Sequence, residues 1–283
     1  MTPRPLLAAL LVCVIASHDV SAQPVPQAGD SYFVDAATDL DTRLQARPNT
    51  GRARNVILFV GDGMGVSTLT AARIYQGQRA GRDGESTWTA MDRMPFSALV
   101  KTYAHDAQVP DSAPTATALT TGVKTRNGVI GIDQTVAEDD CAGSRGREVM
   151  TFFEQAEAAG LRTGIVSTAR ITHATPAATY AHVANRDWEN DSDLSSAARR
   201  AGCVDIARQL VEWPYGDGLD VVLGGGRAQF MPRTATDPED AKAVGLRTDG
   251  RDLTREWSLR PSGGRYVWNR ALFDAFEGDG PLL

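Results

Sequence analysis

Cysteine and histidine are scarce in this sequence, with three cysteines and four histidines among 283 residues. No two cysteines form a Cys-x-x-Cys pair, which argues against a zinc knuckle and against a redox motif. The chain also has no basic stripe, because 29 lysines and arginines face 35 acidic residues and give a net charge of −6. We therefore expect no nucleic-acid partner. The apolar fraction of 42% is ordinary for a globular protein with a sizeable core.

Long hydrophobic runs are missing beyond the N-terminus. The apolar run from Leu6 to Ala16 follows Arg4 and precedes the small residues that end at Ala22. This order is typical of a secretory signal peptide. The run is too short to cross a bilayer, which needs about 20 apolar residues. We predict a signal peptide over residues 1–22, export to the periplasm or the extracellular space, and no membrane span in this chain.

Cleavage after Ala22 would remove Cys13 and leave Cys141 and Cys203. In an oxidising compartment, two remaining cysteines most simply form one disulfide. Two unpaired thiols are the alternative.

The remaining chain divides into an N-terminal arm over residues 23–54 and an alternation of strands and helices from residue 55 onwards. The arm is predicted to contain a short helix over 38–46 with Thr38 as its N-cap. The apolar runs predict strands at 55–60, 97–104, 163–168 and 220–223, and the patterns between them predict helices at 67–76, 112–121, 148–159, 176–184 and 193–212. This alternation predicts an α/β fold, a three-layer sandwich with a central, mostly parallel sheet. Residues 233–264 are polar and aperiodic and predict a surface excursion.

Asp62 follows the first predicted strand directly, in Gly61-Asp62-Gly63-Met64-Gly65. Ligands of open α/β sheets collect at the carboxyl ends of the strands, and a carboxylate is a hard oxygen donor for zinc or magnesium. A tight turn with an exposed aspartate is the alternative. A dinucleotide-binding loop is excluded, because Val66 occupies the sixth position where that loop requires glycine.

Ser112 stands where a small-residue helix begins, in Pro110-Asp111-Ser112-Ala113-Pro114. The positive end of that helix favours an alkoxide at this position, although a metal ion is still needed to lower the pKa of the hydroxyl. An N-cap serine is the structural alternative. A Ser-His-Asp hydrolase is another, with His105, His173 and His182 as candidate bases, although the usual Gly-x-Ser-x-Gly elbow is absent.

A third polar element, residues 168–186, follows a predicted buried strand and so lies at the same sheet edge as Asp62. Thr175 is placed to reach a magnesium ion directly and His173 to reach it through water. Arg186 offers a planar fork that suits two phosphate oxygens. A surface histidine, a threonine in a turn and a solvated arginine are the corresponding structural alternatives.

Together these elements resemble the alkaline phosphatase family, from about residue 55 to residue 226 and more loosely to residue 283. The resemblance rests on Val56-Ile-Leu-Phe-Val-Gly-Asp62-Gly-Met-Gly, Asp111-Ser112-Ala, Thr121-Gly-Val-Lys-Thr and His173-Ala-Thr175-Pro-Ala-Ala. His173 is similar to the variant of animal-type enzymes, and Cys141 and Cys203 match a disulfide of that group.

The resemblance implies hydrolysis of phosphate monoesters through a phosphoserine at a site with two zinc ions and one magnesium ion. It implies that Ser112 attacks phosphorus and that zinc-bound hydroxide then releases the phosphate. The remaining implied roles are a metal bridge for Asp62, a magnesium ligand for Thr175, a water-mediated magnesium contact for His173, a phosphate clamp for Arg186 and orientation of that clamp for Asp111. A homodimer is implied for the full-length protein.

The sequence departs from the family in its zinc ligands. The family binds zinc with three histidines, two aspartates and the bridging carboxylate, whereas no histidine follows His182 and the Gly-Gly-Arg-Ile-Asp-His-Gly type of motif is missing. We therefore expect residues 55–283 to be the truncated N-terminal part of a catalytic domain, with an incomplete sheet and no useful activity alone. A non-catalytic exported module that binds phosphate or metal is the second hypothesis.

Overall fold

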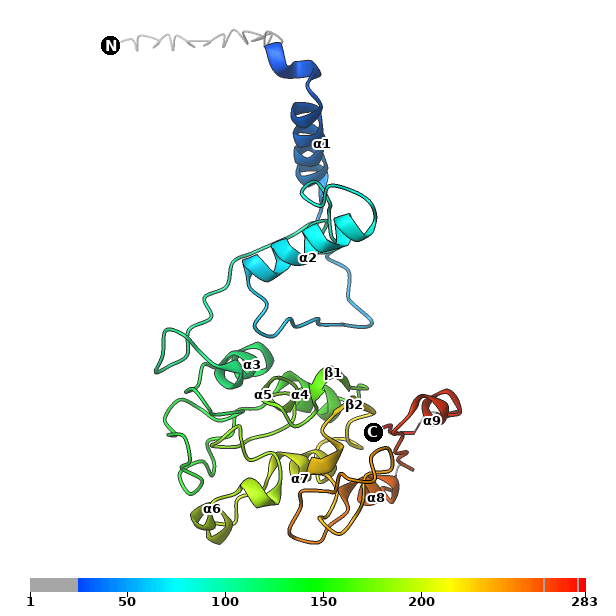
Figure 1. The fold of residues 1–283 in the computed structure, drawn as a ribbon. Helices are drawn as coiled ribbons and strands as arrows, with labels where there is room; N and C mark the ends of the chain where they lie inside the picture. The colour runs from blue at the N-terminus through cyan, green and yellow to red at the C-terminus, as the bar shows by residue number, and fades with distance from the viewer. Residues whose placement is uncertain (1–24, 262, 279) are drawn as a thin grey trace, which may run out of the picture.

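The computed structural model describes residues 25–261, 263–278 and 280–283. The predicted signal peptide, residues 1–22, lies outside the described residues. The arm carries a short 3-10 helix, η1 (Pro26–Gly29), and the helix α1 (Ser31–Gln45). The helix begins earlier than predicted because Asp30, not Thr38, caps it and accepts the backbone N–H of Tyr32 at 2.9 Å. Figure 1 shows α1 projecting away from the rest of the chain.

Two predicted strands are wrong. Residues 55–60 and 97–104 are irregular in the structure, and the side chains of the first segment are exposed, with Val56 at 84% and Phe59 at 90%. A continuous apolar run indicates a strand that is buried on both faces, but such a strand also needs neighbours for its backbone hydrogen bonds. Within the described residues neither segment pairs with another strand. The sequence pattern shows that these segments are apolar, but it does not predict their conformation.

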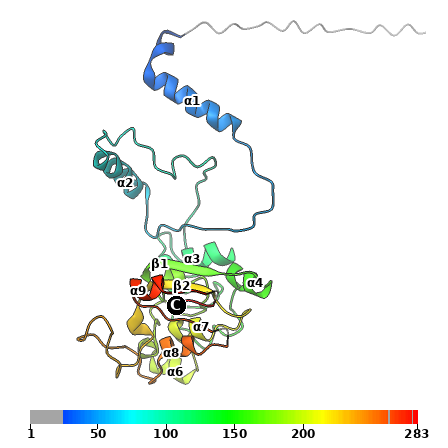
Figure 2. The same ribbon diagram turned by 90° about the vertical axis from the view of Figure 1, so that its right-hand side faces the viewer.

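The helices that flank the predicted catalytic elements are confirmed. α2 (Val66–Arg79) covers the predicted range 67–76, and α3 (Ser112–Thr121) begins and ends as predicted. α3 ends where Gly122 adopts a φ of 76°, a left-handed conformation that favours glycine and closes the helix. Figures 1 and 2 show α2 apart from the compact part of the chain, and α3 on the side of that part that faces α2.

The sheet of the described residues has two parallel strands, β1 (Gly164–Arg170) and β2 (Val221–Gly225). Gly164 pairs with Val221, and Val166 with Leu223. Leu282 adds a parallel bridge to Val221. Both views show α3 on one side of the strands and the helices α6 (Ser196–Arg200), α7 (Ile206–Val211) and α8 (Leu253–Ser258) on the other. The predicted α/β class and parallel pairing are confirmed.

Three predicted helices are shorter than expected. The helix predicted over 148–159 is α4 (Phe152–Ala158), which begins at a capping box formed by Thr151 and Glu154. The helix predicted over 176–184 is wrong for most of its length: the single turn α5 (Ala174–Ala177) shares only residues 176 and 177 with it. The long helix predicted over 193–212 is wrong: the 3-10 turn η2 (Asp191–Asp193), α6 and α7 replace it. Gly202, with a φ of 77°, ends α6, and Asp205 caps α7.

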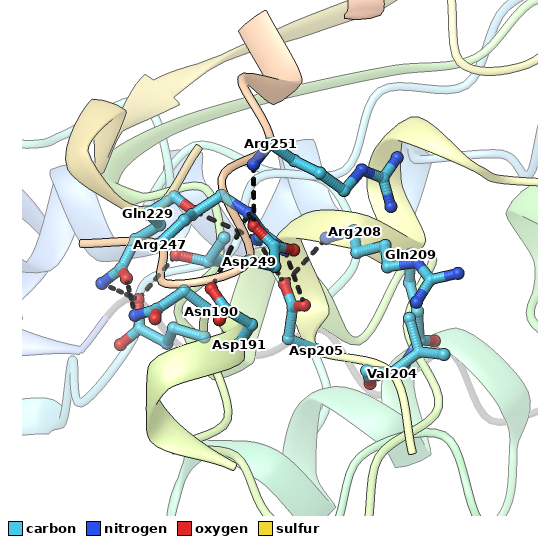
Figure 3. Close-up of polar contacts among 12 residues, drawn as sticks. Asn190, Asp191, Val204, Asp205, Arg208, Gln209, Gln229, Arg247, Asp249 and Arg251 are labelled. Atoms are coloured by element: carbon cyan, nitrogen blue, oxygen red, sulfur yellow. Dashed lines mark hydrogen bonds and ion pairs between the residues drawn. The ribbon is translucent and has the colours of Figure 1, made fainter. Parts of the chain in front are cut away.

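The polar segment 233–264 does not stay on the surface. It contains α8, and it buries Leu253 and Trp257 completely. Its Arg247 side chain is also fully buried, beside Asp205 from the start of α7 and Asp249 (Figure 3). The segment is flanked by the 3-10 turn η3 (Arg227–Gln229) and the helix α9 (Arg270–Asp274). The predicted surface excursion is therefore wrong for its second half, because a paired arginine allows polar sequence to enter a core.

The core lies between the sheet and the two helical layers and includes Ile130, Ile132, Ile206, Leu210, Leu219 and Val222. Cys141 and Cys203 form a disulfide at its margin with a Cα–Cα distance of 6.1 Å, which confirms the predicted pairing. No helix among the described residues is both long and apolar enough to cross a membrane.

Candidate active site

Asp62, Ser112 and Thr175 come together although they are far apart in the sequence. The Ser112 hydroxyl lies 3.0 and 3.1 Å from the two Asp62 carboxylate oxygens, and the Thr175 hydroxyl donates to Asp62 Oδ2 at 2.9 Å. Asp62 reaches this point from the turn after residues 55–60, Ser112 from the first position of α3 and Thr175 from α5. The structure therefore assembles three of the predicted site residues around one exposed carboxylate.

Ser112 is not the N-cap of α3. Asp111 caps the helix: its Oδ1 accepts the backbone N–H of Ala113 at 2.9 Å, and its Oδ2 accepts that of Gly128 at 3.0 Å. The alternative interpretation of Ser112 as a capping serine is wrong. Its hydroxyl instead lies in the positive field at the start of the helix, which stabilises negative charge there.

Arg186 joins the two remaining predicted residues. Its Nη1 lies 3.4 Å from Asp111 Oδ2, and its Nη2 lies 3.1 Å from His173 Nε2. A guanidinium only donates, so Nε2 accepts, and the proton of a neutral imidazole lies on Nδ1. The backbone N–H of Arg186 also donates to the Gly128 carbonyl at 2.7 Å. His173 thus contacts the arginine directly. The water-mediated contact of His173 to a magnesium ion stays a prediction.

The Ser-His-Asp alternative finds no support among the described residues, where none of its candidate bases bonds to Ser112. The His182 ring lies between the Glu154 carboxylate at 2.7 Å and the Gly131 carbonyl at 2.6 Å. The His173 ring contacts Arg186. The Ser112 hydroxyl contacts a carboxylate instead of an imidazole, an arrangement without a histidine base.

The donor atoms around Asp62 suit one kind of metal ion and not the other. The carboxylate and hydroxyl oxygens of Asp62, Ser112 and Thr175 are the hard ligands that magnesium prefers. Zinc sites usually include nitrogen or sulfur donors. Within the residues the structure describes, no three His, Cys, Asp or Glu side chains are grouped as a metal site. The residues in place therefore fit a magnesium ion and do not fit the zinc pair that the resemblance implies.

Sequence reasoning missed a group of polar residues beside this site. Arg170, at the end of β1, pairs with the buried Glu189 at 2.7 Å, and Thr172 donates to the same carboxylate at 2.6 Å. The position of Arg170 at a strand end, three residues before His173, was the available signal. Glu189 gave none, because it lies in a polar segment without periodicity.

Comparison with known proteins identifies relatives with similar sequences and a similar fold. The alkaline phosphatase family model matches residues 53–279. The tissue-nonspecific isozyme of alkaline phosphatase from Gallus gallus is 47% identical over 228 residues, 78% of this chain and 44% of that protein. The corresponding isozyme from Mus musculus is 48% identical over 235 residues, 81% of this chain and 44% of that protein.

Solved structures of alkaline phosphatases also align with this chain. A cold-active alkaline phosphatase from the psychrophile Shewanella sp. aligns with a TM-score of 0.55 at 29% identity, covering 79% of this chain and 44% of its own. The alkaline phosphatase of Thermus thermophilus aligns with a TM-score of 0.56 at 27% identity, covering 79% of this chain and 38% of its own. The chain thus spans less than half the length of these relatives. From its motifs, its fold and these matches, the chain belongs to the alkaline phosphatase family.

Proposed function

We propose that this chain supplies the nucleophile and the phosphate clamp of a phosphate monoester hydrolase. The observation that carries the proposal is the Ser112 hydroxyl, which lies at the start of α3 and 3.0 Å from Asp62, with Arg186 held against Asp111 nearby. A serine hydroxyl that lies at a helix N-terminus without capping the helix, and beside a carboxylate, is suited to attack an electrophile that carries negative charge. Family membership supports phosphate monoesters as the substrates.

In the proposed reaction, Arg186 binds two phosphate oxygens with its planar fork while Asp111 holds the guanidinium in place. Ser112 Oγ attacks phosphorus in line with the leaving alcohol: the new Oγ–P bond forms as the bond from phosphorus to the alcohol oxygen breaks, and the alcohol leaves with the proton that the Ser112 hydroxyl gives up. Water then hydrolyses the phosphoserine to inorganic phosphate and restores the Ser112 hydroxyl. Asp62 accepts the hydrogen bond of the hydroxyl and orients Oγ for the attack. A magnesium ion held by Asp62, Ser112 and Thr175 would supply positive charge that favours the alkoxide.

We also propose that the chain alone turns over poorly. A serine hydroxyl stays protonated at neutral pH without strong electrostatic help. The described residues hold no group of three His, Cys, Asp or Glu side chains that could bind a zinc ion. The same observation favours the second candidate function, a non-catalytic module that binds phosphate and magnesium through Arg186 and Thr175. Export to the periplasm or the extracellular space and homodimerisation of the full-length protein complete the proposal.

The test measures phosphate binding and turnover separately. With magnesium present, calorimetry should detect inorganic phosphate binding that Arg186→Ala weakens by about tenfold or more, the scale of a charge-assisted hydrogen-bonded contact. Equal binding by wild type and Arg186→Ala would overturn the phosphate site.

Turnover of an aryl phosphate is then measured with magnesium and zinc added. Any turnover should be abolished by Ser112→Ala and unaffected by Ser86→Ala, a control because Ser86 also donates to an aspartate, Asp83, at 2.5 Å, but outside the site. Chelator-sensitive turnover comparable to that of an intact enzyme would refute the inactivity of the chain while leaving the phosphatase assignment in place.

A further inference from the structure

Glu189 is a buried carboxylate whose oxygens are almost completely occupied by hydrogen bonds. The residue is 8% exposed. Arg170 donates to it with Nε at 2.8 Å and with Nη2 at 2.7 Å, in a forked geometry. Thr172 Oγ1 donates at 2.6 Å and Gln229 Nε2 at 3.2 Å. Four donor atoms from three residues therefore converge on one side chain.

Two of these donor residues, Arg170 and Thr172, lie directly before the site residues His173 and Thr175 in the chain. Arg170 is the last residue of β1, and its carbonyl accepts the backbone N–H of His173 at 2.9 Å, which closes a turn around Thr172. α5, which carries Thr175, begins immediately after this turn. Fixing Arg170 and Thr172 therefore also fixes the exit direction of the chain towards His173 and Thr175.

Glu189 itself lies on the segment that carries Arg186, three residues further along the chain. The backbone between them is held by a turn in which the Trp188 N–H donates to the Asn185 carbonyl at 3.2 Å. One carboxylate thus connects the segment that carries Arg186, the proposed phosphate clamp, to the turn that precedes Thr175, the proposed magnesium ligand.

The charge of Glu189 gives this connection its strength. Burial alone would raise the pKa of its carboxyl, but the hydrogen bonds from Arg170 and Thr172 hold that pKa below its ordinary value. The group is therefore ionised at neutral pH, and its bonds are charge-assisted, about twice as strong as bonds between neutral groups. Gln229, which follows β2, adds the loop of the second strand to the same connection.

We propose that Glu189 is a positioning residue of the site: through Arg170 and Thr172 it sets the location of His173 and Thr175 relative to Arg186. The proposal rests on the proposed function only for the identity of the bound ion, because the effect on His173 is independent of any ligand.

The test uses the histidine rings as reporters in the purified full chain, since His105, His173 and His182 are the histidines of its described part. In nuclear magnetic resonance spectra of the histidine-labelled chain, Glu189→Gln should shift or broaden the ring resonances of His173. A His173→Asn variant assigns these resonances. The resonances of His182 should not change, because its ring contacts lie with Glu154 and Gly131. Glu212→Gln is the matched control, because Glu212 is likewise paired with arginine, in its case Arg208 and Arg251, but at a side-chain exposure of 41%.

A second readout is the affinity for magnesium alone, which Glu189→Gln should weaken about tenfold, the scale seen when a residue supporting a metal ligand is removed. Thr172→Val is the milder variant, since it keeps the Arg170 pair and the shape of the side chain. It should move the His173 resonances in the same direction by less, and it covers the case in which Glu189→Gln does not fold.

The outcomes separate the two ideas. Unchanged His173 resonances in the folded variants would overturn the positioning role, whatever the magnesium affinity. Displaced resonances in a chain whose wild type binds no magnesium would support the positioning role and refute the magnesium part of the proposed function. A merely structural role would lower the unfolding midpoint and leave His173 in place.

Discussion

Replacement of the buried Arg247 by methionine should be among the most destabilising single changes in the chain. The side chain is 0% exposed, and it binds Asp205 through both terminal nitrogens, at 2.9 and 3.1 Å, and Asp249 at 3.1 Å through Nε (Figure 3). Asp205 is itself only 2% exposed. In Arg247→Met the Asp205 carboxylate keeps its buried position and loses its partner, which costs about 3–5 kcal/mol.

The assay is chemical denaturation followed by circular dichroism, with Arg270→Met as the control. Arg270 also pairs with an aspartate, Asp274, at 2.6 Å, but the two side chains are 86% and 52% exposed. Such a surface pair contributes about 0.2–1 kcal/mol, so the control should remain close to wild type. Equal, small losses for both variants would refute the reasoning, because they would mean that burial does not strengthen the pair.

A double variant separates the charge from the packing. Asp205→Asn combined with Arg247→Met removes the unpaired carboxylate, and asparagine still caps α7, where the Arg208 N–H donates to Asp205 at 3.0 Å. The double variant should therefore be more stable than Arg247→Met alone, and the two losses should not add. Strict additivity would contradict a direct interaction between the two residues.

Three further outcomes are expected. Cys203→Ser opens the loop of 62 residues that the disulfide closes and should lower the free energy of unfolding by about 4 kcal/mol through loop entropy. A non-reduced digest of the wild type with both thiols free would show that the pair does not form. Burial would lower the pKa of His182, but the bonds to Glu154 and the Gly131 carbonyl raise it above 6.5. Its stabilisation is thus complete below pH 6.5 and is lost as pH rises through the folded value, so the unfolding free energy of wild type should fall over that window and that of Glu154→Gln should fall less. Asp62→Ala should abolish magnesium binding measured by calorimetry, because Asp62 is the one carboxylate of the Ser112 and Thr175 group, and unchanged binding would place the ion elsewhere.

The sequence was most informative where chemistry and local structure coincide. Ser112 was recognised because a helix start is legible from Asp111 and the small residues that follow, and the structure confirms that helix. Asp62 was recognised because it follows an apolar run between glycines. Its position beside Ser112 does not require the run to form a strand, which explains why the residues meet although the predicted strand is wrong.

Two of the errors, at Arg247 and Glu189, share a physical cause: an ion-pair partner elsewhere in the fold determines whether the charged side chain is buried. Arg247 looks like a surface residue in sequence, and only the carboxylates of Asp205 and Asp249 allow its burial. Glu189 was missed for the same reason, since Arg170 makes its burial possible. The sequence shows that these residues are polar. Their burial depends on groups distant in the sequence, which no local pattern reveals.

The contacts of Asp62 also predict an order of events during folding. They close intervals of 50 and 113 residues, to Ser112 and Thr175 respectively. Closing longer loops costs more chain entropy, and contacts distant in sequence form slowly. The segment that delivers Asp62 has exposed apolar side chains instead of core contacts to guide it. In a refolding reaction, near-ultraviolet signals from the buried Trp257 should therefore recover before the Ser112 hydroxyl has its carboxylate partner, so that packing of the protein precedes its chemical competence.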